Sequence, residues 1–171
     1  ITVIGGGWGP SLEKEKFLEF CDYVCFGEGE RVMSEASLKI LENDRDFSTI
    51  NNISYKLSGK LVSNPVSVPL SNDELTGLPF PDFLPENKYL IDRNEILCGK
   101  ESANLKIYNC LAGRGCPLNC TYCMSSKYSM LYRKHGYKIP KYRIRKVETV
   151  IEELEKAKKD GAIYIRISDE I

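Results

Sequence analysis

Three cysteines in an eight-residue run constrain this chain more than any other feature. Cys116, Cys120 and Cys123 follow the spacing C-x3-C-x2-C within the run GRGCPLNCTYC, directly after a predicted strand. Gaps this short place three thiolates in one small loop, and soft thiolates select iron–sulfur clusters, zinc or copper(I). A cubic cluster has four irons, so three cysteines leave one iron open to bind a substrate directly.

Two other side chains are available as a fourth ligand in this part of the chain. Zinc would use the three cysteines together with Cys110 or His135, but structural zinc sites usually come as two separated cysteine pairs. Cys110 is also a possible fourth cluster ligand, although a small apolar residue that ends a strand is the simpler interpretation. The remaining thiols, Cys21, Cys25 and Cys98, are predicted to be core or incidental residues.

Composition places the chain among globular proteins without a strong electrostatic preference. The 171 residues carry 24 basic and 24 acidic side chains, so no net field draws the protein to nucleic acid or to an acidic membrane. No apolar run approaches the roughly 20 residues that span a bilayer. The odd cysteine count and the clustered thiols suit a reducing compartment, so we expect a cytoplasmic protein. The chain opens on an apolar run and closes inside a predicted strand, which predicts an internal fragment of a longer protein.

The first stretch, residues 1–50, has a β-α-β-α pattern. A strand ends at Ile4, a glycine-rich loop follows, and a helix is predicted to run to about Phe20. A short apolar strand over residues 23–26 then leads through Gly27-Glu28-Gly29-Glu30 into a second helix. Alternation of strands and helices with short glycine loops predicts a parallel, doubly wound α/β sheet.

The second stretch, residues 51–103, is predicted to be a connector. Ile53–Leu57 and 60–62 are two strands separated by Ser58-Gly59, which predicts a β-hairpin. Five prolines follow within about twenty residues, and this density does not sustain helices or central strands. We therefore expect this stretch to wrap over neighbouring surfaces.

The third stretch, residues 104–171, starts again with a β-α-β pattern. A strand over residues 105–109 precedes a long loop region, 110–146, with room for a short helix. Apolar side chains then recur at helical spacing from Val147 to Ala157, and Gly161 stands where a C-terminal cap belongs. The next strand, residues 163–167, is predicted to lie parallel to the first by the right-handed crossover rule.

The cysteine loop resembles the radical S-adenosylmethionine superfamily, whose hallmark is this spacing after the first strand of a partial (β/α) barrel. The resemblance implies a 4Fe-4S cluster whose open iron binds the amino and carboxylate groups of S-adenosylmethionine. Reductive cleavage then yields a 5′-deoxyadenosyl radical. The resemblance also implies an electron donor such as flavodoxin or ferredoxin, and a small-molecule substrate.

The same resemblance implies roles for three further residues. Tyr122 matches the aromatic residue that lies against adenine. Ser168-Asp169-Glu170 stands where the family holds the methionine amino group, and the side chains of Asp169 and Glu170 suit an ammonium group. This run differs from the commoner Gly-Gly-Glu form.

The glycine loops upstream extend the resemblance. Gly5-Gly6-Gly7 alone is typical of a strand–helix turn. Together with the run FGEGE at residues 26–30 and the cysteine loop, it resembles radical enzymes with an N-terminal cobalamin-binding domain. That resemblance implies that Gly5 and Gly6 lie beside the nucleotide tail of cobalamin. Residues 1–50 are then the C-terminal part of a Rossmann-like cobalamin-binding domain, 51–103 a connector, and 104–171 the N-terminal part of the radical barrel.

A basic, tyrosine-rich segment follows the cysteines. Between Met124 and Val147 the chain has no acidic residue, while basic side chains alternate with tyrosines. Such interleaving can bind RNA, but a solvated loop beside an anionic cluster is the preferred interpretation, and nucleic acid is not an expected partner.

Three functions are open from the sequence. The leading one is cobalamin-dependent methyl transfer or a related C–H functionalisation. The second is a radical methylthiotransferase acting on RNA or a ribosomal protein, and the third is a non-catalytic zinc or iron–sulfur binding module.

Overall fold

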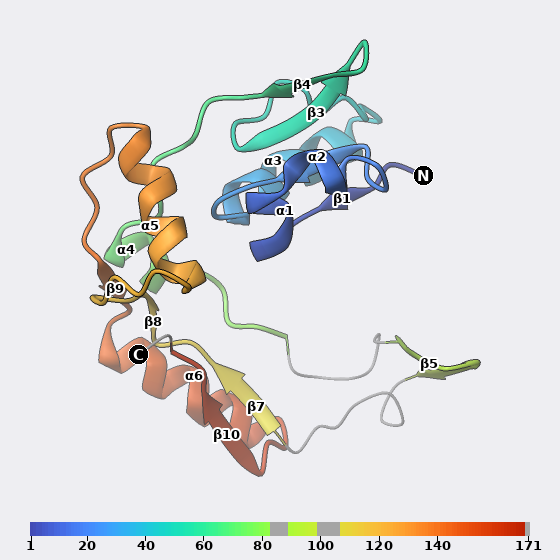
Figure 1. Ribbon diagram of the computed structural model, residues 1–171. Helices are drawn as coiled ribbons and strands as arrows, with labels where there is room; N and C mark the ends of the chain where they lie inside the picture. Colours follow the sequence, from blue (N-terminus) through green and yellow to red (C-terminus); the bar gives the residue numbers. More distant parts are fainter. Residues whose placement is uncertain (83–88, 99–106, 170–171) are drawn as a thin grey trace. The chain divides into compact units, whose positions relative to one another are not determined.

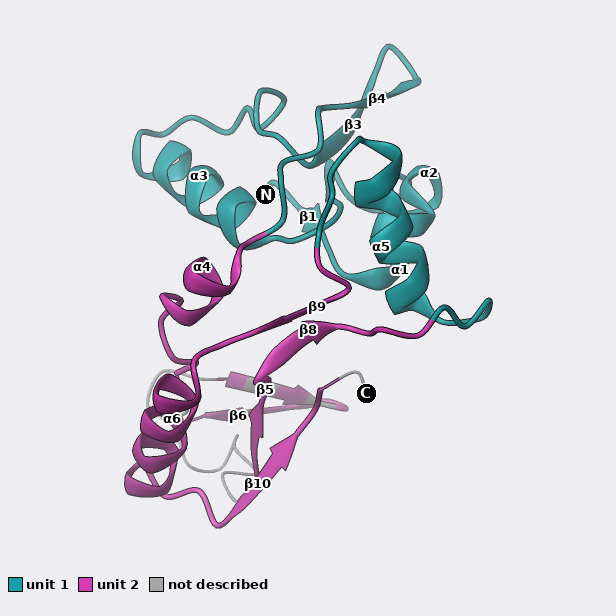
Figure 2. Ribbon diagram, turned by 90° about the vertical axis from the view of Figure 1, so that its left-hand side faces the viewer, with its two compact units in different colours: residues 1–69, 119–139 teal, residues 70–118, 140–171 magenta. Residues whose placement is uncertain are grey.

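The structure is a computed structural model that describes residues 1–82, 89–98 and 107–169. It divides into two compact units (Figure 2). Residues 1–69 and 119–139 form the first unit, and residues 70–118 and 140–171 form the second. The α/β class is confirmed, since each unit combines strands with helices.

The first unit is built on a four-stranded sheet in the order β1-β2-β3-β4 (Figure 1). The strands are β1 (Ile4–Gly5), β2 (Tyr23–Cys25), β3 (Ile53–Leu57) and β4 (Lys60–Ser63). β1 and β2 are parallel, as the β-α-β pattern predicted. The predicted hairpin is confirmed as β3 and β4, and β3 pairs antiparallel with β2, so the sheet is mixed rather than wholly parallel.

Four helices belong to this unit. They are α1 (Trp8–Leu12), α2 (Lys14–Phe17), α3 (Glu30–Leu41) and α5 (Met124–Lys134). The single helix predicted to run to about Phe20 is therefore two short helices, whereas the helix after the FGEGE run is confirmed as α3. Val32 and Ala36 on α3 are buried against Phe47, Ile50 and Ile53 in one hydrophobic core.

The tyrosine-rich segment after the cysteines is not a solvated loop, which corrects the prediction. It forms α5, and Tyr132 on this helix is 1% exposed in a second core with Phe26 and Val66. Tyr128 packs edge-on against Tyr132 and against the ring of Trp8. The reason is helical spacing, because side chains four residues apart lie on the same face of a helix. Basic residues occupy the exposed side of the same helix.

The turn before α3 is fitted around α5. The backbone N–H of Glu28 donates a hydrogen bond of 2.8 Å to the Tyr132 hydroxyl, and Asn52 Nδ2 donates one of 2.8 Å to the Phe26 carbonyl. Gly27 has φ of +78°, and a Cβ built on it would lie 2.6 Å from Asn52 Nδ2 and 2.8 Å from the Tyr132 hydroxyl. Only glycine fits this turn.

The described residues of the second unit form three pairs of strands and two helices. Its elements are α4 (Asn72–Thr76), β5 (Tyr89–Asp92), β6 (Glu95–Cys98), β7 (Ile107–Cys110), β8 (Gly113–Gly115), β9 (Tyr142–Ile144), α6 (Val147–Lys159) and β10 (Tyr164–Ile167). β7 and β10 are parallel, with Ile107 opposite Tyr164 and Cys110 opposite Ile167, so the predicted β-α-β crossover is confirmed. β8 pairs antiparallel with β9, and β5 with β6. The first two residues of the predicted strand 105–109 lie outside the described residues.

Helix α6 covers the β7 strand. Tyr108, Cys110 and Ala157 form a buried cluster. Glu153 on α6 is 2% exposed, accepts a 2.7 Å hydrogen bond from the Tyr108 hydroxyl and forms an ion pair with Arg145 at 2.5 Å. A buried carboxylate is tolerated because these two partners replace the water it loses.

Helix α4 lies in the stretch that the sequence analysis expected to be only a connector. Ser71 and Glu74 form a capping box at its start, a signature that the run Ser-x-x-Glu carries in the sequence. The helix then anchors the segment between β9 and α6. Asn72 Oδ1 accepts a hydrogen bond from the Ile144 N–H, and Thr76 Oγ1 accepts one from the Lys146 N–H, each at 3.1 Å.

Replacement of Gly27 by alanine tests the fit of this turn. Gly59, in the β3–β4 turn, is a matched control because its φ is +77° and nothing lies within 4 Å of a Cβ built there. Gly59→Ala is expected to lower the free energy of unfolding by about 1–2 kcal/mol, because alanine disfavours the left-handed backbone conformation. Gly27→Ala is expected to lower the free energy of unfolding by about 1–3 kcal/mol more than Gly59→Ala, because its methyl group overpacks the turn. Urea unfolding measures both, and equal losses would contradict the fit described here.

Candidate functional site

The first cysteine of the motif is delivered by a strand pair in the second unit. β8 ends at Gly115, and Cys116 follows it directly. Pairing of β8 with β9 places Gly115 opposite Tyr142, and Lys141 Nζ donates a 3.0 Å hydrogen bond to the Pro117 carbonyl. The backbone on both sides of Cys116 is therefore held by the β9 segment.

The other two cysteines belong to the first unit, at the start of α5. Cys123 is the N-cap residue of this eleven-residue helix, and its N–H donates a 3.1 Å hydrogen bond to the Cys120 carbonyl. The first turn of α5 contains no acidic side chain.

The three motif cysteines carry free thiols. All seven cysteines are free thiols, and Cys116, Cys120 and Cys123 are each partly exposed. Within the described residues, no three His, Cys, Asp or Glu side chains are grouped so as to hold a metal ion. The cluster therefore stays a prediction that rests on the spacing of the cysteines and on their free, partly exposed state.

The two alternative fourth ligands are poorly suited to bind metal. Cys110 ends β7 and is fully buried, and burial together with the charge of Glu153 raises the pKa of its thiol from about 9 to about 11. A thiol held in its protonated form is a weak ligand. His135 is the exposed C-cap of α5, twelve residues after Cys123, which corresponds to about 18 Å along a helix. His135 and Cys123 are too far apart to share an ion.

The residues predicted to contact S-adenosylmethionine differ in their surroundings. Tyr122 is 85% exposed, so its ring is accessible to a stacking partner. Asp169 follows β10 and already accepts three hydrogen bonds, from the backbone N–H groups of Ala112 (2.8 Å) and Gly113 (3.2 Å) and from the Tyr142 hydroxyl (3.1 Å). Glu170 lies outside the described residues.

The two glycines predicted to border cobalamin lie at the carboxyl end of β1. Gly5 ends the strand, and a Cβ built on it would lie 2.9 Å from Cys21 Sγ. A Cβ on Gly6 would meet Cys25 Cβ at an ordinary contact of 3.8 Å. Packing within the first unit therefore explains the absence of a side chain at Gly5, while Gly6 carries no such restriction.

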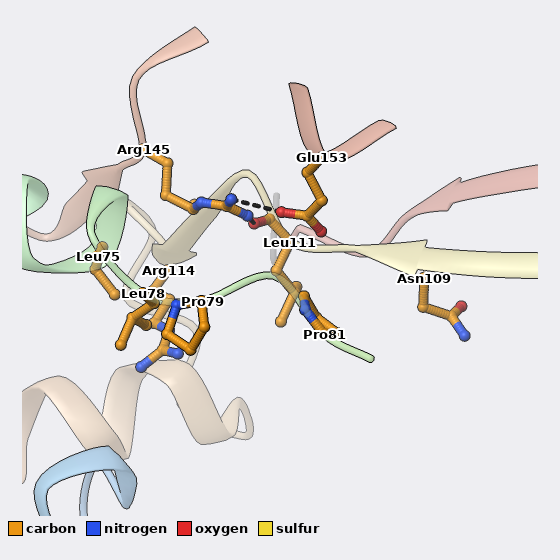
Figure 3. Close-up of a pocket in the computed structure, with 10 residues that line it drawn as sticks. Leu75, Leu78, Pro79, Pro81, Asn109, Leu111, Arg114, Arg145 and Glu153 are labelled. Atoms are coloured by element: carbon orange, nitrogen blue, oxygen red, sulfur yellow. Dashed lines mark hydrogen bonds and ion pairs between the residues drawn. The ribbon is translucent and has the colours of Figure 1, made fainter. Parts of the chain in front are cut away.

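A cavity of about 150 Å³ lies within the second unit (Figure 3). The Arg145–Glu153 ion pair borders it, and its other lining residues are Leu75, Leu78, Pro79, Pro81, Asn109, Leu111, Gly113 and Arg114. Pockets that hold cofactors or drug-sized ligands usually measure about 300 Å³ or more. This cavity is too small for S-adenosylmethionine or cobalamin.

The family comparison agrees with the motif. Residues 111–170 match the sequence model of the Radical SAM superfamily. The matched residues run from the end of β7 to the acidic run after β10 and include all three motif cysteines.

Two curated relatives cover nearly the whole chain. An uncharacterised methyltransferase of Pyrococcus horikoshii is 30% identical over 158 residues, which are 90% of this chain and 30% of that protein. The anaerobic magnesium-protoporphyrin IX monomethyl ester cyclase of Rubrivivax gelatinosus is 26% identical over 162 residues, 90% of this chain and 26% of the cyclase. The chain therefore spans less than a third of the length of these relatives.

Solved structures share the fold. The radical S-adenosylmethionine methyltransferase TsrM from Kitasatospora setae aligns with 99% of this chain and 30% of its own at a TM-score of 0.62 and 20% identity. The cobalamin-dependent radical enzyme OxsB aligns with 98% of this chain and 21% of its own at a TM-score of 0.61 and 22% identity. In residues 1–82, 89–98 and 107–169, no helix has the length and apolar character that a membrane crossing requires.

Alkylation of the cluster-free protein tests the surroundings of the thiols. Burial raises the pKa of Cys25 to about 11, as it does for Cys110. A rise of two pKa units lowers the thiolate fraction at pH 8 by about 100-fold. We expect iodoacetamide to label Cys25 and Cys110 at least about 100-fold more slowly than the exposed Cys98, as measured by peptide mass spectrometry.

The same experiment on the cluster-loaded protein reports on the motif. Cys116, Cys120 and Cys123 are expected to react readily without iron and to become protected after anaerobic reconstitution. Cys98 is the internal control and should react in both states. Continued labelling of all three motif cysteines in the loaded protein would show that iron is held elsewhere.

Proposed function

We propose that the chain is part of a radical S-adenosylmethionine enzyme in which Cys116, Cys120 and Cys123 hold a 4Fe-4S cluster. One observation carries the proposal: three free thiols at C-x3-C-x2-C spacing follow the β7–β8 segment, inside the region that matches the radical family. Three protein ligands leave one iron of a cubic cluster open for S-adenosylmethionine.

The residues of this chain have distinct tasks in that proposal. Bound together, the cluster and S-adenosylmethionine supply the reductive cleavage that yields a 5′-deoxyadenosyl radical. Tyr122 offers an exposed ring to adenine, and the acidic run after β10, through Glu170, supplies negative charge for the methionine ammonium group.

We propose cobalamin as a further cofactor, with methyl transfer or a related C–H functionalisation as the reaction. Support comes from the relatives and solved structures described above, which include methyltransferases, a cyclase and a cobalamin-dependent enzyme. The FGEGE run and the Gly5-Gly6 loop on this chain add to that support. The substrate is then a small molecule, and a flavodoxin or ferredoxin supplies the electron.

The alternatives have less support. A methylthiotransferase that acts on RNA would profit from tyrosines free to stack on bases, but Tyr132 is buried and Tyr128 and Tyr137 pack against the same core. A non-catalytic zinc module needs a fourth ligand, and Cys110 and His135 are unsuited for the reasons given above.

Cysteine variants of the full-length protein test the proposal. Anaerobically purified protein is expected to contain about four irons per chain, to show the EPR signal of a reduced cluster and to form 5′-deoxyadenosine from S-adenosylmethionine. Alanine at Cys116, Cys120 or Cys123 should abolish the EPR signal and reduce product to background.

Cys98→Ala is the matched control, since this thiol lies outside the motif. It should retain iron, signal and product. Stoichiometric zinc in the wild-type protein, with no deoxyadenosine formed, would overturn the enzyme proposal in favour of a zinc module.

A further inference from the structure

The carboxylate of Asp169 is already committed to the protein itself. Its Oδ1 accepts from the N–H group of Ala112, which lies between β7 and β8, and from that of Gly113, the first residue of β8. Its Oδ2 accepts from the hydroxyl of Tyr142, the first residue of β9. One side chain thus joins the ends of three strand segments on the approach to Cys116.

The β7–β10 pair sets up this arrangement. The Ser168 N–H donates a 2.9 Å hydrogen bond to the Cys110 carbonyl and so continues the parallel pairing one residue beyond β10. Asp169 therefore lies beside the turn that leaves β7. On the other side of that turn, the Ala112 carbonyl accepts a 2.9 Å hydrogen bond from the Arg145 N–H. The turn is held from both directions.

Gly113 makes the Tyr142 contact possible. A Cβ built on Gly113 would lie 2.5 Å from the Tyr142 hydroxyl oxygen and 2.6 Å from its ring carbon Cζ. The tyrosine therefore lies directly on the Gly113 backbone, and its hydroxyl faces Asp169. Burial and the hydrogen bond to Asp169 raise the pKa of Tyr142, which keeps the hydroxyl protonated as a donor.

We propose that Asp169 is a positioning residue that fixes the turn leading to the cluster-binding loop, and that it does not hold the methionine ammonium group of S-adenosylmethionine. The proposal rests on the function proposed above and refines it. A carboxylate has about four lone-pair sites, and three of them are used here. These contacts need an acceptor at Oδ1 and a polar partner at Oδ2, but they do not need a negative charge.

Asn and Ala substitutions in the full-length protein separate the two roles. In Asp169→Asn, the amide oxygen still accepts from Ala112 and Gly113, and the amide nitrogen donates to Tyr142, whose hydroxyl is also an acceptor. The negative charge is lost. For a positioning role, we expect S-adenosylmethionine to bind Asp169→Asn within about 3-fold of the wild-type affinity, measured by titration of the cluster EPR signal.

An ammonium-binding role predicts the opposite. Loss of a charge-assisted hydrogen bond costs about 1.5–3 kcal/mol, so the affinity of Asp169→Asn would fall by about 10-fold or more. If the EPR signal without S-adenosylmethionine also remained unchanged, this result would overturn the proposal. Glu170→Gln is measured beside it as the other acidic candidate.

Asp169→Ala and Tyr142→Phe test the hydrogen bonds themselves. Asp169→Ala is expected to alter the EPR signal of the cluster before S-adenosylmethionine is added, because the turn loses its hydrogen bonds to the carboxylate. Tyr142→Phe is expected to change the signal in the same direction by a smaller amount. An unaltered signal in Asp169→Ala would contradict the positioning role. If Asp169→Ala does not fold, the Asn and Phe variants still decide the question.

Hydrogen exchange on cluster-free protein separates this proposal from the proposed function. The Ala112 and Gly113 amides are expected to be protected in wild type and Asp169→Asn and to exchange faster in Tyr142→Phe. Amides that exchange as slowly in both Tyr142→Phe and Asp169→Ala as in wild type would overturn the positioning role. Failure of the wild-type protein to bind iron would overturn the proposed function instead and leave the exchange result standing.

Discussion

The second unit depends on one buried charge, the Glu153 carboxylate. It connects three segments, since it lies on α6, accepts from Tyr108 on β7 and pairs with Arg145 ahead of α6. Arg145 Nη1 in turn donates a 3.1 Å hydrogen bond to the Leu111 carbonyl, just beyond β7. Removing one partner of a buried ion pair costs about 3–5 kcal/mol, because the other charge is left without compensation. The end of β7, from which the cysteine loop departs, is therefore fixed relative to the helix that covers it.

Sequence reasoning succeeded where local pattern and pairing rules agree. The crossover from β7 through α6 to β10 follows from apolar spacing between Val147 and Ala157, and the β3–β4 hairpin follows from Ser58-Gly59 between two apolar runs. It left room for a short helix in 110–146 but did not identify the buried face of α5, because tyrosines among basic residues are compatible both with a solvated loop and with a buried helical face. Only the contacts of Tyr132 with the Phe26–Glu28 turn decide between them.

The role of Asp169 is another case that sequence alone does not settle. The sequence shows only an acidic residue after β10. It does not show whether that residue accepts hydrogen bonds from an ammonium group or from backbone N–H groups. The difference lies in the β10–β7 register and in the distant Tyr142, neither of which the acidic run itself encodes. The motif cysteines are different, since their spacing of three and two residues can be read from the sequence without knowledge of the fold.

The FGEGE run gains a physical explanation from the first unit. Its glycine turn fits against Tyr132, and Tyr132 lies on the helix whose N-cap is Cys123. A run near the start of the sequence and the last motif cysteine thus belong to one compact unit, although nearly a hundred residues separate them. A side chain at Gly27 would press on Asn52 and Tyr132 and so disturb the packing of α5. Glycine at this position serves the placement of the cysteine helix, whether or not a cofactor also contacts the loop.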